Sequence, residues 1–448
     1  MTATGVARAT ATRHRHAFVL LGSVQTVLIF TLAAIAIPLP HLAHEFALER
    51  SDVILLSAAY GLTFAGLLLF GGRLADRHGG RPVLTAGLLL FAAASAAVPF
   101  APGIEVLLAA RFAQGAGAAL VAPAAMAVLR VLFPSPTAYG KAMATWGGLS
   151  VLGATAGNLL SGVISALLSW RWTFAVPLVV AITALALAPR LLPDTAPNRG
   201  RALDLPAALL ATLGITLASY GLVVTDARPW SSSDVLVPLL GGTALLASFW
   251  YAEHRARDPL LPPRFLLDRR RALALTATAL SACGTAMTFV IFSLHLQQGR
   301  DWSQLQTSAA FVPFAVALIA SGRTAGPLIG RYGAGAVTSA GLGTGAAGLA
   351  LLAGTGLDAH TWYAYGLLPG LVLLSAGAAA SFAGAAVLAT EGVPQRQSGL
   401  AGGVLNTAME FGPTAVFAGL LTLGSDASSL AVTGAALAVA ALLNHRTK

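Results

Sequence analysis

The amino-acid sequence predicts an all-α polytopic membrane protein, and its composition is the first reason. Of 448 residues, 56% are apolar and only 10% are charged, whereas soluble domains carry about 25% charged residues. Soluble domains of this total length could not cover their surfaces with so few charges. The single cysteine, Cys283, excludes an internal disulfide and any metal or cluster site built from several cysteines.

Fourteen apolar runs are the second reason, because each is long enough to form a transmembrane helix. A bilayer core takes about 20 mostly apolar residues in helical form, since lipid offers no partner to backbone polar groups. Arg8, Arg13 and Arg15 precede the first run as in a signal peptide, but its apolar stretch is too long, and we expect a retained helix. The predicted spans are 17–40, 52–72, 82–101, 105–129, 139–165, 172–191, 205–224, 235–252, 272–297, 305–326, 334–355, 362–389, 398–423 and 428–443.

The positions of Lys and Arg predict the orientation through the positive-inside rule. With a cytoplasmic N-terminus, 22 of the 27 basic residues fall in inner segments and one, Arg111, falls within a span. The net charge of +10 is then mostly a topological signal, and we expect no nucleic acid as partner. Both termini are predicted to be cytoplasmic, with tails at 1–16 and 444–448. The four basic residues left for the outer loops are Arg50, Arg171, Arg228 and Arg300.

An internal repeat is the third reason, and it divides the chain into halves. Residues 72–79 read GRLADRHG and residues 326–333 read GPLIGRYG, which are identical at four of eight positions. Transporters are commonly built from duplicated halves that face a site at the midplane. We predict six-helix bundles at 17–200 and 271–443, separated by two inserted helices and a cytoplasmic linker at 201–270, a 6+2+6 arrangement.

Several segments resemble the major facilitator superfamily, in particular its fourteen-helix drug:proton antiporters. Residues 72–81 (GRLADRHGGR) look like the loop between helices two and three, and 107–119 (LLAARFAQGAGAA) resemble the fourth-helix motif. Residues 153–162 (GATAGNLLSG) resemble the fifth-helix motif of antiporters, and 398–407 (SGLAGGVLNT) a further segment. The resemblance implies the major-facilitator fold and export of drugs or natural products by proton antiport with alternating access.

Two positions depart from the pattern of that family. Asn158 stands where the fifth-helix motif normally has proline, which weakens the inference of antiport. Ile29 stands where the first-helix motif usually has an aspartate, so a usual candidate for proton coupling is absent.

Two charged residues are expected deep in the membrane, and we take them as the candidates for proton coupling. Arg111 costs about 2.5–3.5 kcal/mol to insert. It either bonds to backbone carbonyls of the first helix and holds the bundle together, or acts on a nearby acid or on substrate. Glu410 lies about halfway along the thirteenth span, where loss of water favours the protonated carboxyl. It could bind a proton or a cationic substrate, or it could be a neutral, locally bonded side chain. Glu105, at the outer boundary, is a weaker candidate.

A second set of residues is assigned to conformational gating. Asp76 and Arg77 are expected in a tight turn flanked by glycines, with Asp76 against the positive end of the helix that begins near Ser398. By resemblance, this contact would hold the outward-open state; the alternative is that these charges only set the topology. The gating set is Gly72, Asp76, Arg77, Gly79, Arg81, Arg130, Gly153 and Gly157.

The substrate site is expected where the two halves meet, again by resemblance. Each candidate is individually weak, because an aromatic residue in a span is more often packing than a ligand contact. His295 is expected to meet water near an outer end. The candidates are Gln25, Tyr60, Gln114, Trp146, Asn158, Phe289, Phe292, Tyr365 and Asn406.

The sequence offers no catalytic site, metal site or cofactor site. Of nine histidines only His295 lies in a predicted span, and zinc, nucleophile and Walker motifs are absent. The proton gradient is therefore the expected energy source. Importing a small metabolite by proton symport is the main alternative function, and a membrane enzyme is a distant one. We expect a monomer in the lipid bilayer of a bacterial plasma membrane, with an amphipathic or cationic small molecule as substrate.

Overall fold

The computed structural model describes residues 3–35, 38–48, 50–194, 205–225, 228–256, 259, 261, 263–358, 361–393, 397, 400–410 and 425–445. Throughout these residues the regular structure is helical. Within the part of the chain that the structure describes, twelve helices are long and apolar enough to cross a membrane, by length and composition.

The first half of the chain forms one bundle with an attached helix pair. Its helices are α1 (Ala3–Ala33), α2 (Leu39–Glu45), α3 (Arg50–His78), α4 (Gly80–Ala97), α5 (Ile104–Leu132), α6 (Pro136–Leu167) and α7 (Ala175–Leu191), with 3₁₀ turns η1 (Val98–Phe100) and η2 (Trp170–Phe174). The pair α8 (Leu205–Val224) and α9 (Ser233–Arg255) pack on each other, and α8 packs against α3. The inserted segment therefore lies beside the first bundle.

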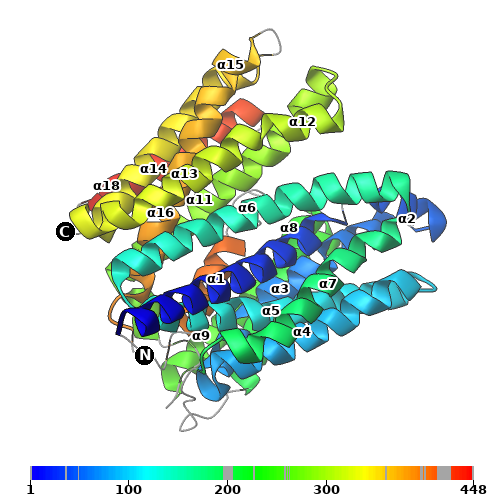
Figure 1. The fold of residues 1–448 in the computed structure, drawn as a ribbon. Coiled ribbons are helices and arrows are strands. Elements are labelled where there is room, and N and C mark those ends of the chain that lie inside the picture. Colours follow the sequence, from blue (N-terminus) through cyan, green and yellow to red (C-terminus); the bar gives the residue numbers. More distant parts are fainter. Residues whose placement is uncertain are drawn as a thin grey trace.

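The second half of the chain forms the other bundle. Its helices α11, α13, α14, α16 and α18 pack on one another, and α6 of the first bundle lies against α13 and α16 (Figure 1). Residues 400–410 form a further helix. The elements are α10 (Pro263–Leu267), α11 (Arg269–Leu294), η3 (His295–Gly299), α12 (Gln304–Ala310), α13 (Val312–Tyr332), α14 (Ala334–Leu351), η4 (Leu352–Gly356), α15 (Tyr363–Gly366), α16 (Leu368–Thr390) and α18 (Asp426–His445).

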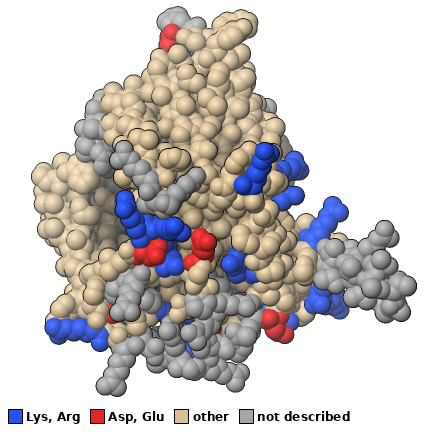
Figure 2. All heavy atoms as spheres, turned by 90° about the vertical axis from the view of Figure 1, so that its left-hand side faces the viewer, with Lys and Arg blue, Asp and Glu red and all other residues tan. Residues whose placement is uncertain are grey.

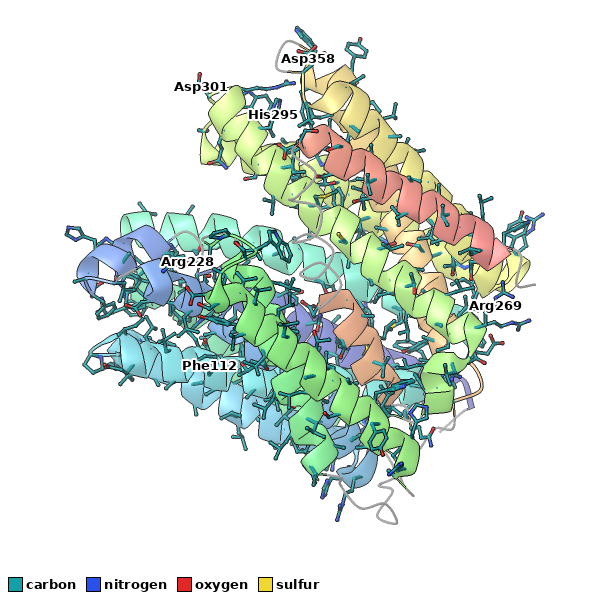
Figure 3. All side chains as sticks on the ribbon, turned by 180° about the vertical axis from the view of Figure 1, so that it is seen from behind. Phe112, Arg228, Arg269, His295, Asp301 and Asp358 are labelled. Carbon is teal, nitrogen blue, oxygen red and sulfur yellow. The ribbon has the colours of Figure 1, made fainter. Side chains whose placement is uncertain are left out.

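Both chain termini lie at the same end of the molecule, which we name the termini end (Figure 1). The ribbons of the two bundles diverge toward the opposite end, the far end, which carries α2, α12 and α15. The face at the termini end gathers Lys and Arg side chains around a few acidic ones (Figure 2). Arg171, which bonds to Glu45 of α2, and Arg300, which bonds to Asp358, instead lie at the far end, as does Arg228 (Figure 3).

Each of the fourteen predicted spans coincides with helical residues, but several boundaries were wrong. The run 17–40 is interrupted, since α1 ends at Ala33 and α2 starts after Pro38. The run 305–326 is divided at Phe311, two residues before Pro313, and continues to Tyr332. Proline lacks the backbone N–H and disfavours helical geometry in the preceding residue, which explains such breaks. Of the run 398–423, residues 398–399 and 411–423 lie outside the described residues.

The turn expected around Asp76 and Arg77 was also placed wrongly. Both residues lie in the last turn of α3, which continues to His78. The chain reverses at Gly79, whose φ of 94° is a conformation that glycine adopts readily. Gly333, at the equivalent place of the repeat, has a φ of 84°. The two halves thus share the geometry of this turn as well as its sequence.

Candidate functional site

Glycines bring the two bundles together at the termini end, along the contact of α6 with α13. A Cβ atom added at Gly326 would lie 2.8 Å from the Thr137 carbonyl oxygen and 2.7 Å from the Lys141 Cβ. A Cβ at Gly330 would lie 2.9 Å from the Thr137 hydroxyl oxygen. Larger residues at these positions would separate the helices, so small side chains are what allow this approach.

A hydrogen bond from Leu400 to Asp76 joins the bundles at a second place, between α3 and the helix 400–410. The Leu400 amide donates to the Asp76 Oδ2 over 2.8 Å, and Asp76 is only 8% exposed. The carboxylate therefore lies at the start of the facing helix, where the partial charge is positive. The contact expected from the sequence is present. Farther along, a Cβ at Gly403 would lie 2.8 Å from the Leu68 carbonyl oxygen.

The other predicted gating residues on this side belong to separate contacts. The Arg81 guanidinium pairs with Asp194 at 2.7 Å, which ties the start of α4 to the segment after α7. Arg130 lies at the end of α5, with its guanidinium carbon 4.9 Å from the centre of the Tyr139 ring. Gly72 lies within α3, facing Gly403. Arg77, in the last turn of α3, is half-buried.

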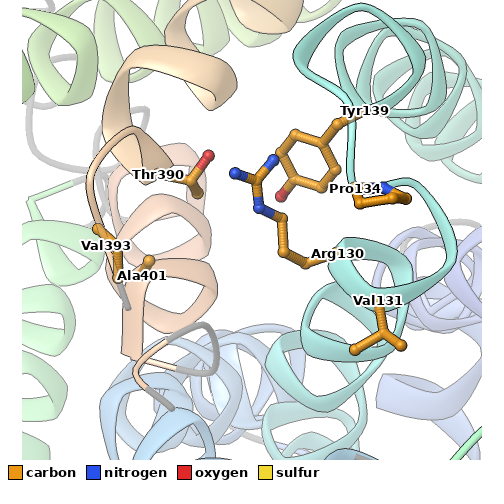
Figure 4. Close-up of a pocket in the computed structure, with 7 residues that line it drawn as sticks. All are labelled: Arg130, Val131, Pro134, Tyr139, Thr390, Val393 and Ala401. Carbon is orange, nitrogen blue, oxygen red and sulfur yellow. The ribbon is translucent and has the colours of Figure 1, made fainter. Parts of the chain in front are cut away.

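Arg130 also faces a cavity of about 220 Å³ at the boundary between the bundles (Figure 4). Among the described residues its Nη1 atom has no hydrogen-bond partner, although this atom is buried. A positive charge therefore lies close to the contact between the two halves. The lining residues are Arg130, Val131, Pro134, Tyr139, Thr390, Val393 and Ala401.

Arg111 is fully buried inside the first bundle, at the centre of a polar cluster. Its Nη1 donates to the Thr31 carbonyl oxygen over 2.9 Å and to the Gln114 Oε1 over 3.3 Å. The Gln114 amide nitrogen donates to the Ser95 hydroxyl over 2.9 Å. The bond to α1 is the arrangement expected for an arginine that holds the bundle together. Gln114 is fully buried in the same cluster.

Tyr60 lies against the same guanidinium. The Arg111 Cζ is 5.0 Å from the centre of the Tyr60 ring, and the Tyr60 hydroxyl donates to the Leu28 carbonyl oxygen over 2.9 Å. Both side chains are fully buried. Such a cation over an aromatic face is stabilised by about 2 kcal/mol or more when desolvated.

Glu410 ends the described part of the helix 400–410 and is half-buried. Asn406, one turn earlier, donates from Nδ2 to the Met126 sulfur on α5 and to the Gly402 carbonyl oxygen, each over 2.9 Å. The intramembrane acid predicted from the sequence thus lies on a helix that packs into the first bundle.

The contact of α1 with α6 contains several other predicted residues. Gln25 is fully buried and donates to the Ser150 hydroxyl over 2.9 Å. Trp146 is fully buried, and its indole N–H has no partner among the described residues. Gly153 packs against the Thr26 carbonyl oxygen, and a Cβ at Gly157 would lie 2.7 Å from the Phe30 carbonyl oxygen. Both glycines permit a close helix approach.

The remaining candidates for the substrate site are scattered over the second bundle and α6. Phe289 stacks on Phe311 with ring centres 4.4 Å apart, and Phe292 is fully buried. Tyr365 is 79% exposed at the far end and is not gathered with the others. The side chain of Asn158 lies outside the described residues. His295 is at the far end of α11, where η3 begins (Figure 3).

Sequence reasoning missed two polar contacts at the end of the inserted pair. Arg73 on α3 donates to the Pro259 carbonyl oxygen, and the Glu253 Oε2 accepts from the Leu261 amide over 2.7 Å. Glu253 is 1% exposed, although its neighbours His254 and Arg255 are exposed. Because the local pattern looks like a solvated helix end, no signal in the sequence marks Glu253 as buried.

Two helical bundles joined along glycine contacts, with the charged Arg111 fully buried inside one of them, are typical of polytopic membrane transporters. The family model of the Major Facilitator Superfamily matches residues 19–418, and the chain belongs to this family. It is a transporter, and the expectation that it is not an enzyme follows from this membership.

Curated relatives and a solved structure agree with this assignment. The chain is 34% identical to the cephamycin export protein CmcT of Amycolatopsis lactamdurans over 417 residues, which is 92% of this chain and 85% of that protein. It is 33% identical to the puromycin resistance protein pur8 of Streptomyces alboniger over 92% of this chain and 82% of that protein. The human organic anion transporter MFSD10 has the same fold, with a TM-score of 0.67 and 19% identity. The match covers 97% of this chain and 99% of that one.

Proposed function

We propose that this chain exports drug-like or natural-product small molecules across a bacterial plasma membrane in exchange for protons. The single observation that carries the proposal is the position of Glu410, an acid halfway along the predicted thirteenth span, on a helix that contacts α3 of the other half at Leu400 and Gly403. An acid at the contact between moving halves can link its protonation to their movement, because a charged carboxylate resists transfer out of water.

The proposed topology has six helices, two inserted helices and six more, with both termini in the cytoplasm. It is supported by the clustering of Lys and Arg at the termini end (Figure 2), the side that the positive-inside rule assigns to the cytoplasm. The packing of α8 and α9 outside the first bundle supports their interpretation as an insertion at 201–270. We assign the chain to the plasma membrane as a monomer.

The proposed state of this structure is outward-facing. In support, the Asp76–Leu400 bond and the glycine contacts of α6 with α13 join the bundles at the termini end, and the ribbons diverge toward the far end. A proton that arrives from the far side neutralises Glu410, which lowers the cost of removing this side chain from water and favours closure there. Substrate binding from the cytoplasm drives the opposite exchange.

The proposed substrate class follows from the relatives, whose names refer to cephamycin export and puromycin resistance. We take the substrate of this chain to be a small amphipathic molecule, with the buried side chains of Gln25, Trp146 and Asn406 as its polar contacts. Each of these side chains has one buried polar atom without a partner among the described residues. Such atoms favour a bound water or a polar ligand group.

The test is transport driven by a pH gradient in everted vesicles, with a cationic dye and a neutral antibiotic as probes. Glu410→Gln removes the ionisable group at almost constant shape, and we expect it to abolish gradient-driven accumulation. Glu105→Gln is the matched control, because Glu105 is exposed in the first turn of α5. Undiminished gradient-driven transport by Glu410→Gln contradicts the proposal. Movement of substrate in the opposite direction supports proton symport by an importer.

A further inference from the structure

The segment that follows α9 is fastened to the first bundle by two charged side chains. The Arg73 guanidinium on α3 donates to the Pro259 carbonyl oxygen, and the Glu253 Oε2 on α9 accepts from the Leu261 amide over 2.7 Å. Arg73, Glu253 and Leu261 are all buried. A buried charge is costly to leave without its partner, so these contacts form a firm attachment, which we name the first anchor.

The same segment is fastened to the second bundle four residues later. Arg271, at the start of α11, donates from Nη1 to the Phe265 carbonyl oxygen over 3.2 Å, and its Cζ lies 4.2 Å from the centre of the Phe265 ring. It also donates to the carbonyl oxygens of Ala389 over 3.1 Å and Glu391 over 3.3 Å, at the end of α16. One guanidinium thus holds Phe265, which is buried, to two helices of the second bundle, and we name this the second anchor.

The chain between the two anchors is short. Leu261 and Phe265 are four residues apart, a length of chain that spans about 14 Å when fully extended. Without the first anchor, the free chain begins at Arg255, where α9 ends, and the ten residues from there to Phe265 reach about 35 Å. The first anchor therefore shortens the possible reach between the bundles by more than half.

Both anchors lie at the end of the molecule where the halves have to part. Arg73 is three residues before Asp76 near the end of α3, and Arg269, where α11 begins, is at the termini end (Figure 3). In the proposed outward-facing state the bundles are joined at this end, so exposing a central site to the cytoplasm requires them to separate there. A short connection held at both ends limits that separation.

We propose that residues 259–265 form a strap that limits how far the termini end opens, with Arg73, Glu253 and Arg271 as the positioning residues that set its free length. The inference rests on the proposed alternating movement of the halves and not on which residue carries the proton. It also gives the inserted pair a role, because α9 supplies Glu253 to the first anchor and α8 holds the pair against α3.

The test measures the opening as a distance between spin labels at the termini end. Arg190, in the last turn of α7, and His445, at the end of α18, are exposed and belong to opposite halves. Both are replaced by cysteine and labelled in a Cys283→Ser background, and distances are measured by double electron–electron resonance in nanodiscs, with and without a cationic dye.

The double variant Arg73→Met, Glu253→Leu releases the first anchor, because neither new side chain forms the hydrogen bond of the old one. The free chain then lengthens by about 20 Å, and we expect the longest populated distance between the labels to increase by about 10 Å or more. Arg255→Gln is the control for the loss of charge, since Arg255 is exposed at the end of α9 and belongs to neither anchor. We expect this control to leave the distances unchanged.

A second variant changes the reach of the strap and leaves every anchoring side chain in place. Six Gly and Ser residues inserted after residue 262 lengthen the chain between the anchors by about 20 Å, and we expect the same increase in distance. The same insertion after Pro229, in the loop between α8 and α9, is the matched control and is expected to change nothing. Poor folding of the double variant therefore does not decide the result.

An unchanged longest distance with the strap insertion overturns the inference, as does an equal increase in either control. An increase with the insertion but none in a folded double variant overturns the role of Arg73 and Glu253. A failure of the proposed function gives a different result. In that case, export by the unchanged protein does not depend on the pH gradient, while the distances still respond to the length of the strap.

Discussion

The two halves of the repeat contribute the same turn to the termini end but join the opposite half by different means. Asp76 and Gly330 occupy equivalent positions, each two residues before the end of its helix, α3 or α13, and each precedes a glycine with positive φ by three residues. At Asp76 a carboxylate accepts a hydrogen bond from Leu400. At Gly330 the absence of a side chain lets α13 approach Thr137 on α6.

This difference separates a polar contact from a packing contact. When the bundles part, water can replace the carboxylate at the Leu400 amide, whereas no water restores the close packing of glycine against a helix. We therefore expect the contact of Asp76 with Leu400, the Asp76 corner, to depend on charge. We expect the packing of Gly330 against Thr137, the Gly330 corner, to depend on side-chain volume. The following predictions test that distinction.

The largest effect is expected from Asp76→Ala. The change leaves the buried Leu400 amide without its acceptor, which costs about 1–3 kcal/mol in the closed arrangement of the termini end. We expect correctly inserted protein without measurable drug export, and partial export with Asp76→Asn, which keeps an acceptor oxygen. The measurement is export in cells, normalised to the amount of protein in the membrane. Full export by inserted Asp76→Ala contradicts the interpretation of this corner as a charge-dependent contact.

A smaller effect is expected from Gly326→Ala, beside the Gly330 corner. The added Cβ would lie 2.8 Å from the Thr137 carbonyl oxygen, and backbone cannot rotate away. Overpacking of this kind costs about 1–3 kcal/mol, and we expect export to fall about tenfold. Gly330→Ala should cost less, because its Cβ would meet the Thr137 hydroxyl at 2.9 Å, and that side chain can rotate.

Gly343→Ala is the matched control for both glycine variants, since a Cβ there has no atom within 4 Å. Export rates and thermal unfolding in detergent provide the measurements. Equal losses in Gly326→Ala and Gly343→Ala would mean that helical glycine matters in general and that close packing at this corner does not.

Most of the fold was predictable from the sequence, because a bilayer imposes a simple length rule on apolar runs. The family and the repeat were also predictable, and the family match over residues 19–418 confirms the family. The errors occur at prolines such as Pro38 and Pro313, where the apolar pattern continues but the helix does not. Hydropathy measures transfer from water and contains no information about backbone geometry.

The site was predictable only in part. Charged residues in apolar runs are conspicuous because their burial is costly, which singled out Arg111 and Glu410. The bond of Arg111 to a backbone carbonyl of the first helix is one of the two arrangements expected from the sequence. Which carbonyl accepts it was not predictable, because every residue has one. Ser95 was not predictable either, because it resembles many other hydroxyl residues in spans, whose hydroxyl groups can bond within their own helix. The place of Tyr60 depends on how α3 packs against α1 and α5, which hydropathy does not define.

The smallest effect is expected at the far end, where a carboxylate joins elements of one bundle only. Glu45 of α2 accepts from the Arg171 Nη2 over 2.7 Å and from the Trp170 indole nitrogen over 2.8 Å. Partial burial opposes ionisation, but these hydrogen bonds and the nearby charge of Arg171 outweigh it, so the pKa of Glu45 is lowered from 4.5. A lowered pKa means that the ionised carboxylate stabilises the folded protein.

That stabilisation is fully present above pH 4.5, the pKa of Glu45 in the unfolded chain. It is lost as pH falls through the lower pKa of Glu45 in the folded protein. We expect Glu45→Gln to reduce stability at pH 7 by about 0.2–1 kcal/mol, as for other partly exposed ion pairs, and to match the unchanged protein at a pH below the folded pKa of Glu45. Thermal unfolding in detergent at both pH values measures this. Export should be unaffected at pH 7, because this carboxylate, unlike Asp76, holds no contact between the bundles. A loss of export as large as that of Asp76→Ala would show that the far end also contains a charge-dependent contact between the halves.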